Sequence, residues 1–125
     1  MLTTLLVGGL LVGGFILGYF WNEIVNFLKR VINTVLSAIK GKPSYTKVFI
    51  RKDGNKVTEI VRCGYRKRYL GLPSPFISVH EERRVIDASD VPPEILARAA
   101  AREKSFGNSE VDITDDVEMK LANAS

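Results

Sequence analysis

The feature that most constrains this chain is a run of about twenty uncharged residues near its start, at positions 2–21. A helix of that length is about 30 Å long at a rise of about 1.5 Å per residue, which matches the hydrocarbon core of a bilayer. A cleaved signal peptide would begin with basic residues, whereas Met1 is followed by Leu-Thr-Thr. A soluble helix apolar on every side is a weaker alternative, because a small domain has little core to surround it. We therefore predict a transmembrane helix over residues 2–21.

The flanks of this predicted span suggest its orientation. Tyr19, Phe20 and Trp21 close it with three aromatic rings, as expected at a membrane interface. Basic residues follow the span on its C-terminal side: Lys29, Arg30, Lys40, Lys42 and Lys47. Because basic residues are retained on the cytoplasmic side, we expect a single-pass membrane protein with its N-terminus outside and its C-terminal part in the cytoplasm.

The predicted span contains five glycines, namely Gly8, Gly9, Gly13, Gly14 and Gly18. Small residues four positions apart let two helix backbones approach closely in lipid, where no hydrophobic force draws helices together. This spacing occurs from Gly9 to Gly13 and from Gly14 to Gly18, and the five glycines fall on more than one face. We therefore expect a homo-oligomer, in a ring or patch. The alternative is that the glycines reflect only the higher glycine content of membrane helices.

Residues 22–41 predict an amphipathic helix that follows the span without a turn signal and ends at Gly41 and Pro43. Its apolar positions recur at helical spacing: Ile24, Phe27, Leu28, Val31, Ile32, Val35 and Ile39. Its polar positions form a stripe: Asn22, Asn26, Lys29, Asn33, Ser37 and Lys40. The helix either continues the span and packs neighbours into a bundle, or lies in the headgroup layer with Lys29 and Arg30 toward anionic lipid. A second span is disfavoured, because each of these two charges would cost about 2.5 kcal/mol or more at mid-bilayer.

The remainder of the chain predicts an α+β arrangement. Residues 45–52 and the segment after the turn Asp53-Gly54-Asn55 predict a β-hairpin, and two further short strands complete a small antiparallel domain over residues 45–85. This unit is too small to be stable alone and should pack on a neighbour or on the amphipathic helix. A soluble helix is predicted over residues 90–105, with Asp90 as its N-cap and Pro92 and Pro93 in its opening turn. Residues 106–125 form an acidic tail, which is either disordered or docks on a partner as an edge strand or short helix.

Charge divides the chain into two parts. Residues up to 84 contain 14 Lys and Arg against five Asp and Glu, a balance of +9. From residue 85 onward, four bases face nine acids, a balance of −5, which gives the overall +4. The chain therefore has a basic middle and an acidic end.

The densest basic cluster consists of Arg62, Arg66, Lys67 and Arg68, interleaved with Tyr65 and Tyr69. With Lys29 and Arg30 it predicts a surface that binds membrane lipid or another anionic partner. An acidic protein surface, including the tail of a neighbouring copy, is an alternative. Single-stranded nucleic acid is a weaker one, because no RNP-type motif accompanies the cluster.

The sequence contains no constellation for catalysis. Its single histidine, His80, lacks the second histidine of a His-Glu-x-x-His zinc motif, since Arg84 occupies that position. Its single cysteine, Cys63, has no partner for a disulfide and is expected to be a small packing residue. The glycine pairs are not followed by Gly-Lys-Ser/Thr, so they are not a phosphate loop. We therefore expect no enzyme activity, no cofactor and no metal.

Together these features predict a non-catalytic single-pass membrane protein that self-associates through its glycine-rich helix. It would act as a subunit of a membrane assembly or pore. The more specific version of this hypothesis is a holin-like or phage-defence membrane effector. The alternatives are a membrane-tethered binding or adaptor module, and an accessory subunit of a larger membrane or virion complex.

Overall fold

The computed structural model describes residues 18–39 and 43–124. Most of the predicted span, including Gly8, Gly9, Gly13 and Gly14, lies outside the described residues. Within the described ranges, no helix combines the length and the apolar character needed to cross a bilayer.

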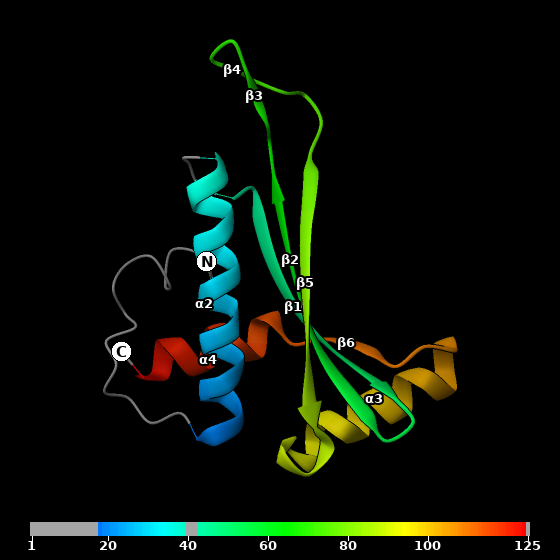
Figure 1. The fold of residues 1–125 in the computed structure, drawn as a ribbon. Coiled ribbons are helices and arrows are strands. Elements are labelled where there is room, and N and C mark those ends of the chain that lie inside the picture. Colours follow the sequence, from blue (N-terminus) through cyan, green and yellow to red (C-terminus); the bar gives the residue numbers. More distant parts are fainter. Residues whose placement is uncertain (1–17, 40–42, 125) are drawn as a thin grey trace.

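The described chain is an α+β fold built on a small antiparallel sheet, as the sequence predicts (Figure 1). The sheet has the strand order β5-β2-β1-β6, and a separate two-stranded ribbon, β3-β4, extends from it. The strands are β1 (Tyr45–Asp53), β2 (Lys56–Tyr65), β3 (Arg68–Tyr69), β4 (Leu72–Pro73), β5 (Ser78–Asp87) and β6 (Glu110–Asp112). The helices are α2 (Tyr19–Ile39), the 3-10 turn η1 (Ala88–Asp90), α3 (Pro93–Phe106) and α4 (Thr114–Ala124).

The predicted hairpin is confirmed in β1 and β2. Asp53 pairs with Lys56 across the two-residue turn, in which Gly54 has a φ of +60°. Glycine holds this first central position of a tight hairpin turn because it adopts positive φ without a steric penalty. The register pairs Val48 with Val61, so that alternate residues of both strands share one apolar face.

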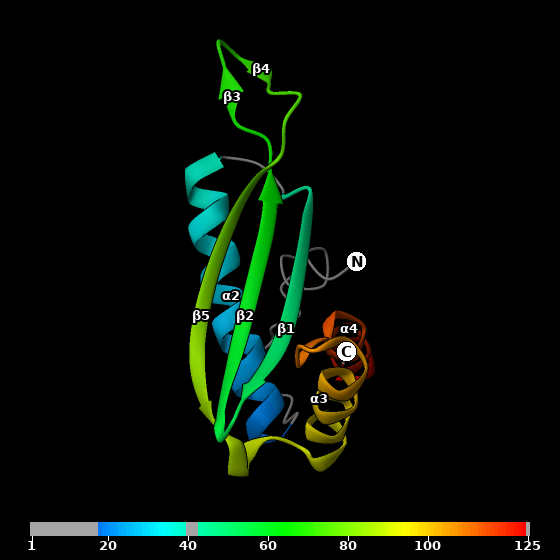
Figure 2. The same cartoon turned by 90° about the vertical axis from the view of Figure 1, so that its right-hand side faces the viewer.

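The helix α2 covers that apolar face, and this contact forms the core (Figure 2). Ile24, Leu28 and Val31 are fully buried, whereas Asn26 and Asn33 on the polar stripe are exposed. Of the two partners predicted for the strands, a neighbour or the amphipathic helix, the structure shows the helix. The apolar stripe of the described helix is covered by the chain's own sheet, so it does not face neighbouring helices or lipid there.

The start of α2 also differs from the prediction. Gly18 has a φ of +94°, which an α-helix does not accommodate, and its carbonyl accepts a hydrogen bond from the Asn22 amide at 2.9 Å. The helix therefore begins at Tyr19 rather than continuing from residues 2–21. Phe20 and Trp21 pack edge to face in the core, with ring centroids 4.9 Å apart, and only Tyr19 is exposed. The predicted interfacial aromatic belt is wrong for Phe20 and Trp21.

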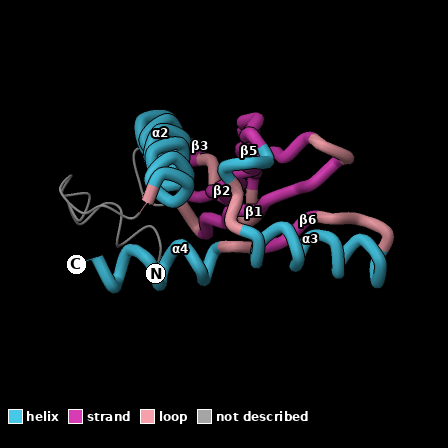
Figure 3. Tube along the Cα trace, turned by 90° about the horizontal axis from the view of Figure 1, so that it is seen from below, coloured by secondary structure: helices cyan, strands magenta, loops and turns pink. Residues whose placement is uncertain are grey.

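The C-terminal third closes the β1 side of the sheet. The predicted helix is α3, but Pro92 rather than Asp90 holds its N-cap position, and Gly107, with a φ of +77°, ends it. The acidic tail docks as an edge strand and short helix, β6 and α4, on its own domain. Its buried apolar side chains are Val111, Ile113, Val117 and Leu121. Figure 3 shows α3 and α4 following one another past β1 and β6.

The packing of α2 predicts a stability effect. Leu28→Ala should lower the free energy of unfolding by about 2–5 kcal/mol, because it leaves a cavity between the helix and the sheet. Chemical denaturation of the full chain in detergent measures this change. Asn33→Ala, on the exposed face of the same helix, is the control and should change it by less than about 0.5 kcal/mol. Equal small effects of both variants would contradict the packing of α2 on the sheet.

Candidate binding surface

The most exposed feature of the described chain is the segment between β2 and β5, residues 66–77, which we call the arm. It contains β3 and β4 and projects past the end of the sheet (Figures 1 and 2). The arm starts after Tyr65, which pairs with Ser78 in the last register position of β2 and β5. The two long strands therefore form a base that holds the arm away from the core.

The tip of the arm is a two-residue turn of unusual conformation. Tyr69 pairs with Leu72, and between them Leu70 and Gly71 have φ values of +53° and +81°. Positive φ at both central positions is the signature of a type I′ hairpin turn. Leu70 is the single non-glycine residue with positive φ in the described ranges, and 88% of it is exposed. A branched apolar residue held in a strained conformation at an exposed tip is typical of a functional position.

Apolar side chains dominate the arm and remain uncovered. The exposed large apolar residues of the arm are Tyr69, Leu70, Leu72, Phe76 and Ile77. Single exposed apolar residues are common, but several large ones on one short projecting segment are typical of an interaction site. The sequence prediction missed this group, because "LGLPSPF" has no helical or strand period that would have assigned its apolar residues to a buried or an exposed face.

Three of the predicted binding residues, Arg66, Lys67 and Arg68, lie on the arm and are exposed. Arg66 donates a hydrogen bond to the carbonyl of Ser74 at 3.0 Å, and Arg68 to that of Gly71 at 3.3 Å. These bonds brace the hairpin. In the part of the chain that the structure describes, none of the three forms an ion pair, so their charges are available to an anionic partner.

The other predicted binding residues lie elsewhere. Arg62 is on the sheet, stacks 4.5 Å from the Phe49 ring centroid and pairs with both Glu81 and Glu110. Its charge is therefore compensated within the fold. Lys29 and Arg30 lie on α2, where Arg30 is exposed and stacks over the ring of Phe27. The predicted six-residue set is thus not one cluster, because its members belong to the arm, the sheet and the helix.

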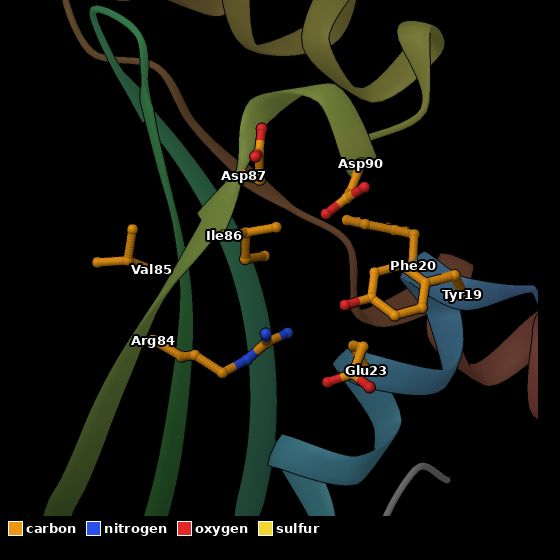
Figure 4. Close-up of a pocket in the computed structure, with 8 residues that line it drawn as sticks. All are labelled: Tyr19, Phe20, Glu23, Arg84, Val85, Ile86, Asp87 and Asp90. Carbon is orange, nitrogen blue, oxygen red and sulfur yellow. The ribbon is translucent and has the colours of Figure 1, made fainter.

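A pocket of about 210 Å³ lies at the opposite end of the sheet, between the start of α2 and the end of β5 (Figure 4). The Tyr19 hydroxyl and the side chains of Glu23 and Arg84 face the same space. Asp87 caps η1 by accepting hydrogen bonds from the amide and hydroxyl of Ser89, which lower the pKa of its carboxyl. The pocket combines acids with one arginine and contains no cysteine, serine or histidine among its described lining residues.

A buried carboxyl lies beneath α2, in the middle of β2. Glu59 is fully buried, and its Oε1 accepts hydrogen bonds from Nε and Nη2 of Arg84 at 3.1 and 2.8 Å. Its Oε2 is buried without a partner. Burial outweighs the attraction of Arg84 and raises the pKa of Glu59 to about 8, so the carboxyl is uncharged at pH 7. Glu59 alternates with Val57 and Val61 on one face of the strand. This pattern is the signal from which sequence analysis could have predicted a buried carboxyl.

His80 and Cys63 take structural positions. The Nε2 of His80 lies 2.8 Å from Oε2 of the half-buried Glu82. Cys63 is fully buried in the core, as predicted, and burial raises the pKa of its thiol. No group of three or more metal-ligating side chains comes together in the described ranges.

No protein-family model, curated protein or solved structure matches this chain. The functional argument therefore depends on the surfaces of the fold itself.

The raised pKa of Glu59 predicts a pH-dependent stability. Between its ordinary pKa of 4.5 and about 8, the folded chain retains a proton that the unfolded chain releases. Glu59 therefore lowers the free energy of unfolding as pH rises, by up to about 1.4 kcal/mol per pH unit. Glu59→Gln, which keeps the uncharged shape, should become progressively more stable than wild type from pH 5 to pH 8 in chemical denaturation. Glu94→Gln, on the exposed face of α3, is the control, and parallel curves for Glu59→Gln and wild type would contradict the assignment.

Proposed function

We propose that this chain is a non-catalytic, membrane-tethered binding module whose arm binds a protein partner. The observation that carries the proposal is the arm itself, with its exposed apolar residues beside the uncompensated charges of Arg66, Lys67 and Arg68. Single exposed apolar side chains are common, but folded domains seldom expose several large ones on one short segment unless it is an interaction site. The arm therefore has an apolar tip and basic residues where it leaves the sheet. Such a surface is complementary to an acidic protein surface that has an apolar recess at its centre.

The tether is the uncharged stretch that precedes Tyr19. Since Phe20 and Trp21 belong to the core, this stretch is at most residues 2–18, near the lower limit of length for a membrane-spanning helix. The basic balance of the residues that follow favours a cytoplasmic location for the folded domain.

The tether and the arm are at opposite ends of the domain. Asp87, at the end of β5, lines the same pocket as Tyr19, the first residue of α2, and the arm joins the other end of β5. Ten residues of strand span about 30 Å. The arm therefore reaches about 30 Å from the point at which the tether leaves the domain, which favours a neighbouring protein over the lipid around the tether.

Self-association through Gly8, Gly9, Gly13 and Gly14 is a second proposal, favoured by the spacing of these residues in the sequence. Gly18 is not part of it, because its φ of +94° is not helical and it lies just before the first residue of α2. A pore lined by the polar stripe of the amphipathic helix is not part of either proposal, since its described residues Asn26, Asn33 and Ser37 lie on the solvent side of a helix packed against the sheet.

The tether predicts membrane retention that depends on residues 2–18. Leu6→Arg combined with Leu11→Arg should release the chain from the membrane fraction, because each arginine costs about 2.5–3.5 kcal/mol near the centre of a span. Wild type should resist alkaline carbonate extraction, and the two fractions are compared by immunoblotting. Leu70→Arg, which adds the same charge to the arm, should leave retention unchanged. Equal retention of wild type and the double variant would contradict the tether.

The arm predicts a specific protein contact. A photo-crosslinking residue placed at Leu70 in the full chain, expressed in cells, should form a discrete protein adduct. Reversing the charges by Arg66→Glu, Lys67→Glu and Arg68→Glu should reduce that adduct at least about tenfold, because the arm then repels an acidic partner. A crosslinker at Met119, which is also exposed but lies on α4, is the matched control. Adducts with lipid alone, or adducts unaffected by the charge reversal, would contradict a protein partner for the arm.

A further inference from the structure

The strand β5 is an open edge of the sheet. It pairs with β2 over all ten of its residues, and in the described chain it has no strand neighbour on its other side. An open edge of this length presents a row of backbone donors and acceptors to any strand that can pair with it. The other edge is different, since β6 covers part of β1.

The side chains of β5 alternate between the two faces of the sheet. The register places His80, Glu82 and Arg84 beside Cys63, Val61 and Glu59, on the face that α2 covers. The odd-numbered residues therefore lie on the opposite face, in the order Val79, Glu81, Arg83 and Val85. Val79 and Val85 are 55% and 61% exposed.

This order is self-complementary in an antiparallel pair. In a two-fold symmetric pairing centred on Glu82, Val79 meets Val85 of a second copy and Glu81 meets Arg83, and each contact occurs twice. Residues directly opposite one another share a face, so a valid register joins two odd or two even positions. Shifting the centre to Arg83 would place Val79 against Asp87 and Glu81 against Val85, which loses the match on the exposed face, although it would place Glu82 against Arg84 on the other face.

We propose that β5 is a dimerisation edge, at which a second copy of this chain pairs antiparallel with β5 about a two-fold axis at Glu82. The sheet then continues through both copies. Glu81 already contacts Arg62 and Arg83 of its own chain, so Arg83 of the second copy extends an existing row of alternating charges. On the other face, the register brings the two Glu82 carboxylates together at the axis and His80 opposite Arg84, which are like-charge contacts that work against pairing. Within each chain, Glu82 is held 2.8 Å from Nε2 of His80 and Arg84 is held by Glu59.

The pairing agrees with the tether of the proposed function. The two-fold axis is perpendicular to the sheet, so both tethers enter one bilayer when the axis follows the membrane normal. One pair of strands buries an area at the small end of stable interfaces, so the dimer should be weak when free in solution. Confinement to a membrane raises the local concentration and favours it.

Charge reversal tests the pairing in the full chain in detergent micelles, with dimerisation measured by fluorescence energy transfer between labelled copies. Glu81→Arg and Arg83→Glu, each alone, create two like-charge contacts and should weaken dimerisation at least about tenfold. Mixing the two single variants should restore it, because each mismatched residue then meets an opposite charge. Absence of recovery in the mixture would overturn the proposal.

Cysteine crosslinking tests the register independently of the glycine-rich segment. Glu82→Cys should form a disulfide-linked dimer with itself, because two copies of residue 82 meet at the axis. Val79→Cys and Val85→Cys should crosslink with each other but not with themselves, since two copies of residue 79 would be about 20 Å apart. Wild type, whose single cysteine is buried, is the control. Self-crosslinking of Val79→Cys as fast as the mixed pair, or no crosslink of Glu82→Cys, would overturn the pairing.

Charge reversal of the arm should leave these crosslinks unchanged, which separates this proposal from the function of the arm.

Discussion

The contact between α2 and the sheet is the interaction on which the rest of this structure depends. The sheet is only four strands wide, and β6 contributes three residues to it. Without α2, the apolar face around Val48 and Val61 would be exposed to water, which a sheet this small does not tolerate. The same contact fixes the geometry of the outer surfaces, because α2 begins at the Asp87 end of β5 and leaves the arm at the other end (Figure 1).

A buried carboxyl lies inside this same interface. The helix covers the carboxyl of Glu59, whose Oε2 has no hydrogen-bond partner. Arg84 donates a hydrogen bond to its other oxygen, Oε1, and stacks 5.7 Å from the ring centroid of Phe27 on α2. Burial of such a group is tolerated because protonation removes its charge. The pair joins β2, β5 and α2 at one point, so the helix and the edge strand are coupled through it.

The arm and the β5 edge are two surfaces with different chemistry, and the fold keeps them apart. The arm offers apolar and basic side chains at its tip, whereas the edge offers backbone groups with a self-complementary charge pattern. In the proposed dimer the two β5 strands run antiparallel, so the two arms extend in opposite directions. Such a dimer can bind two partners at once while its two tethers remain in one membrane. The arm would then act along the membrane plane, at a distance from either tether.

Local patterns in the sequence were sufficient for the hairpin at Gly54, the amphipathic helix, the existence of α3 and the basic cluster of Arg66, Lys67 and Arg68. Each of these depends on neighbours within about four residues, where spacing and backbone preference decide the outcome. Tertiary structure alone decided what covers each surface. It placed the apolar stripe of α2 against the sheet rather than lipid, gave Arg62 two acidic partners, and left the apolar tip of the arm uncovered. The physical reason is that periodicity identifies an apolar face but not its partner, because the partner is set by pairing between residues far apart in the chain.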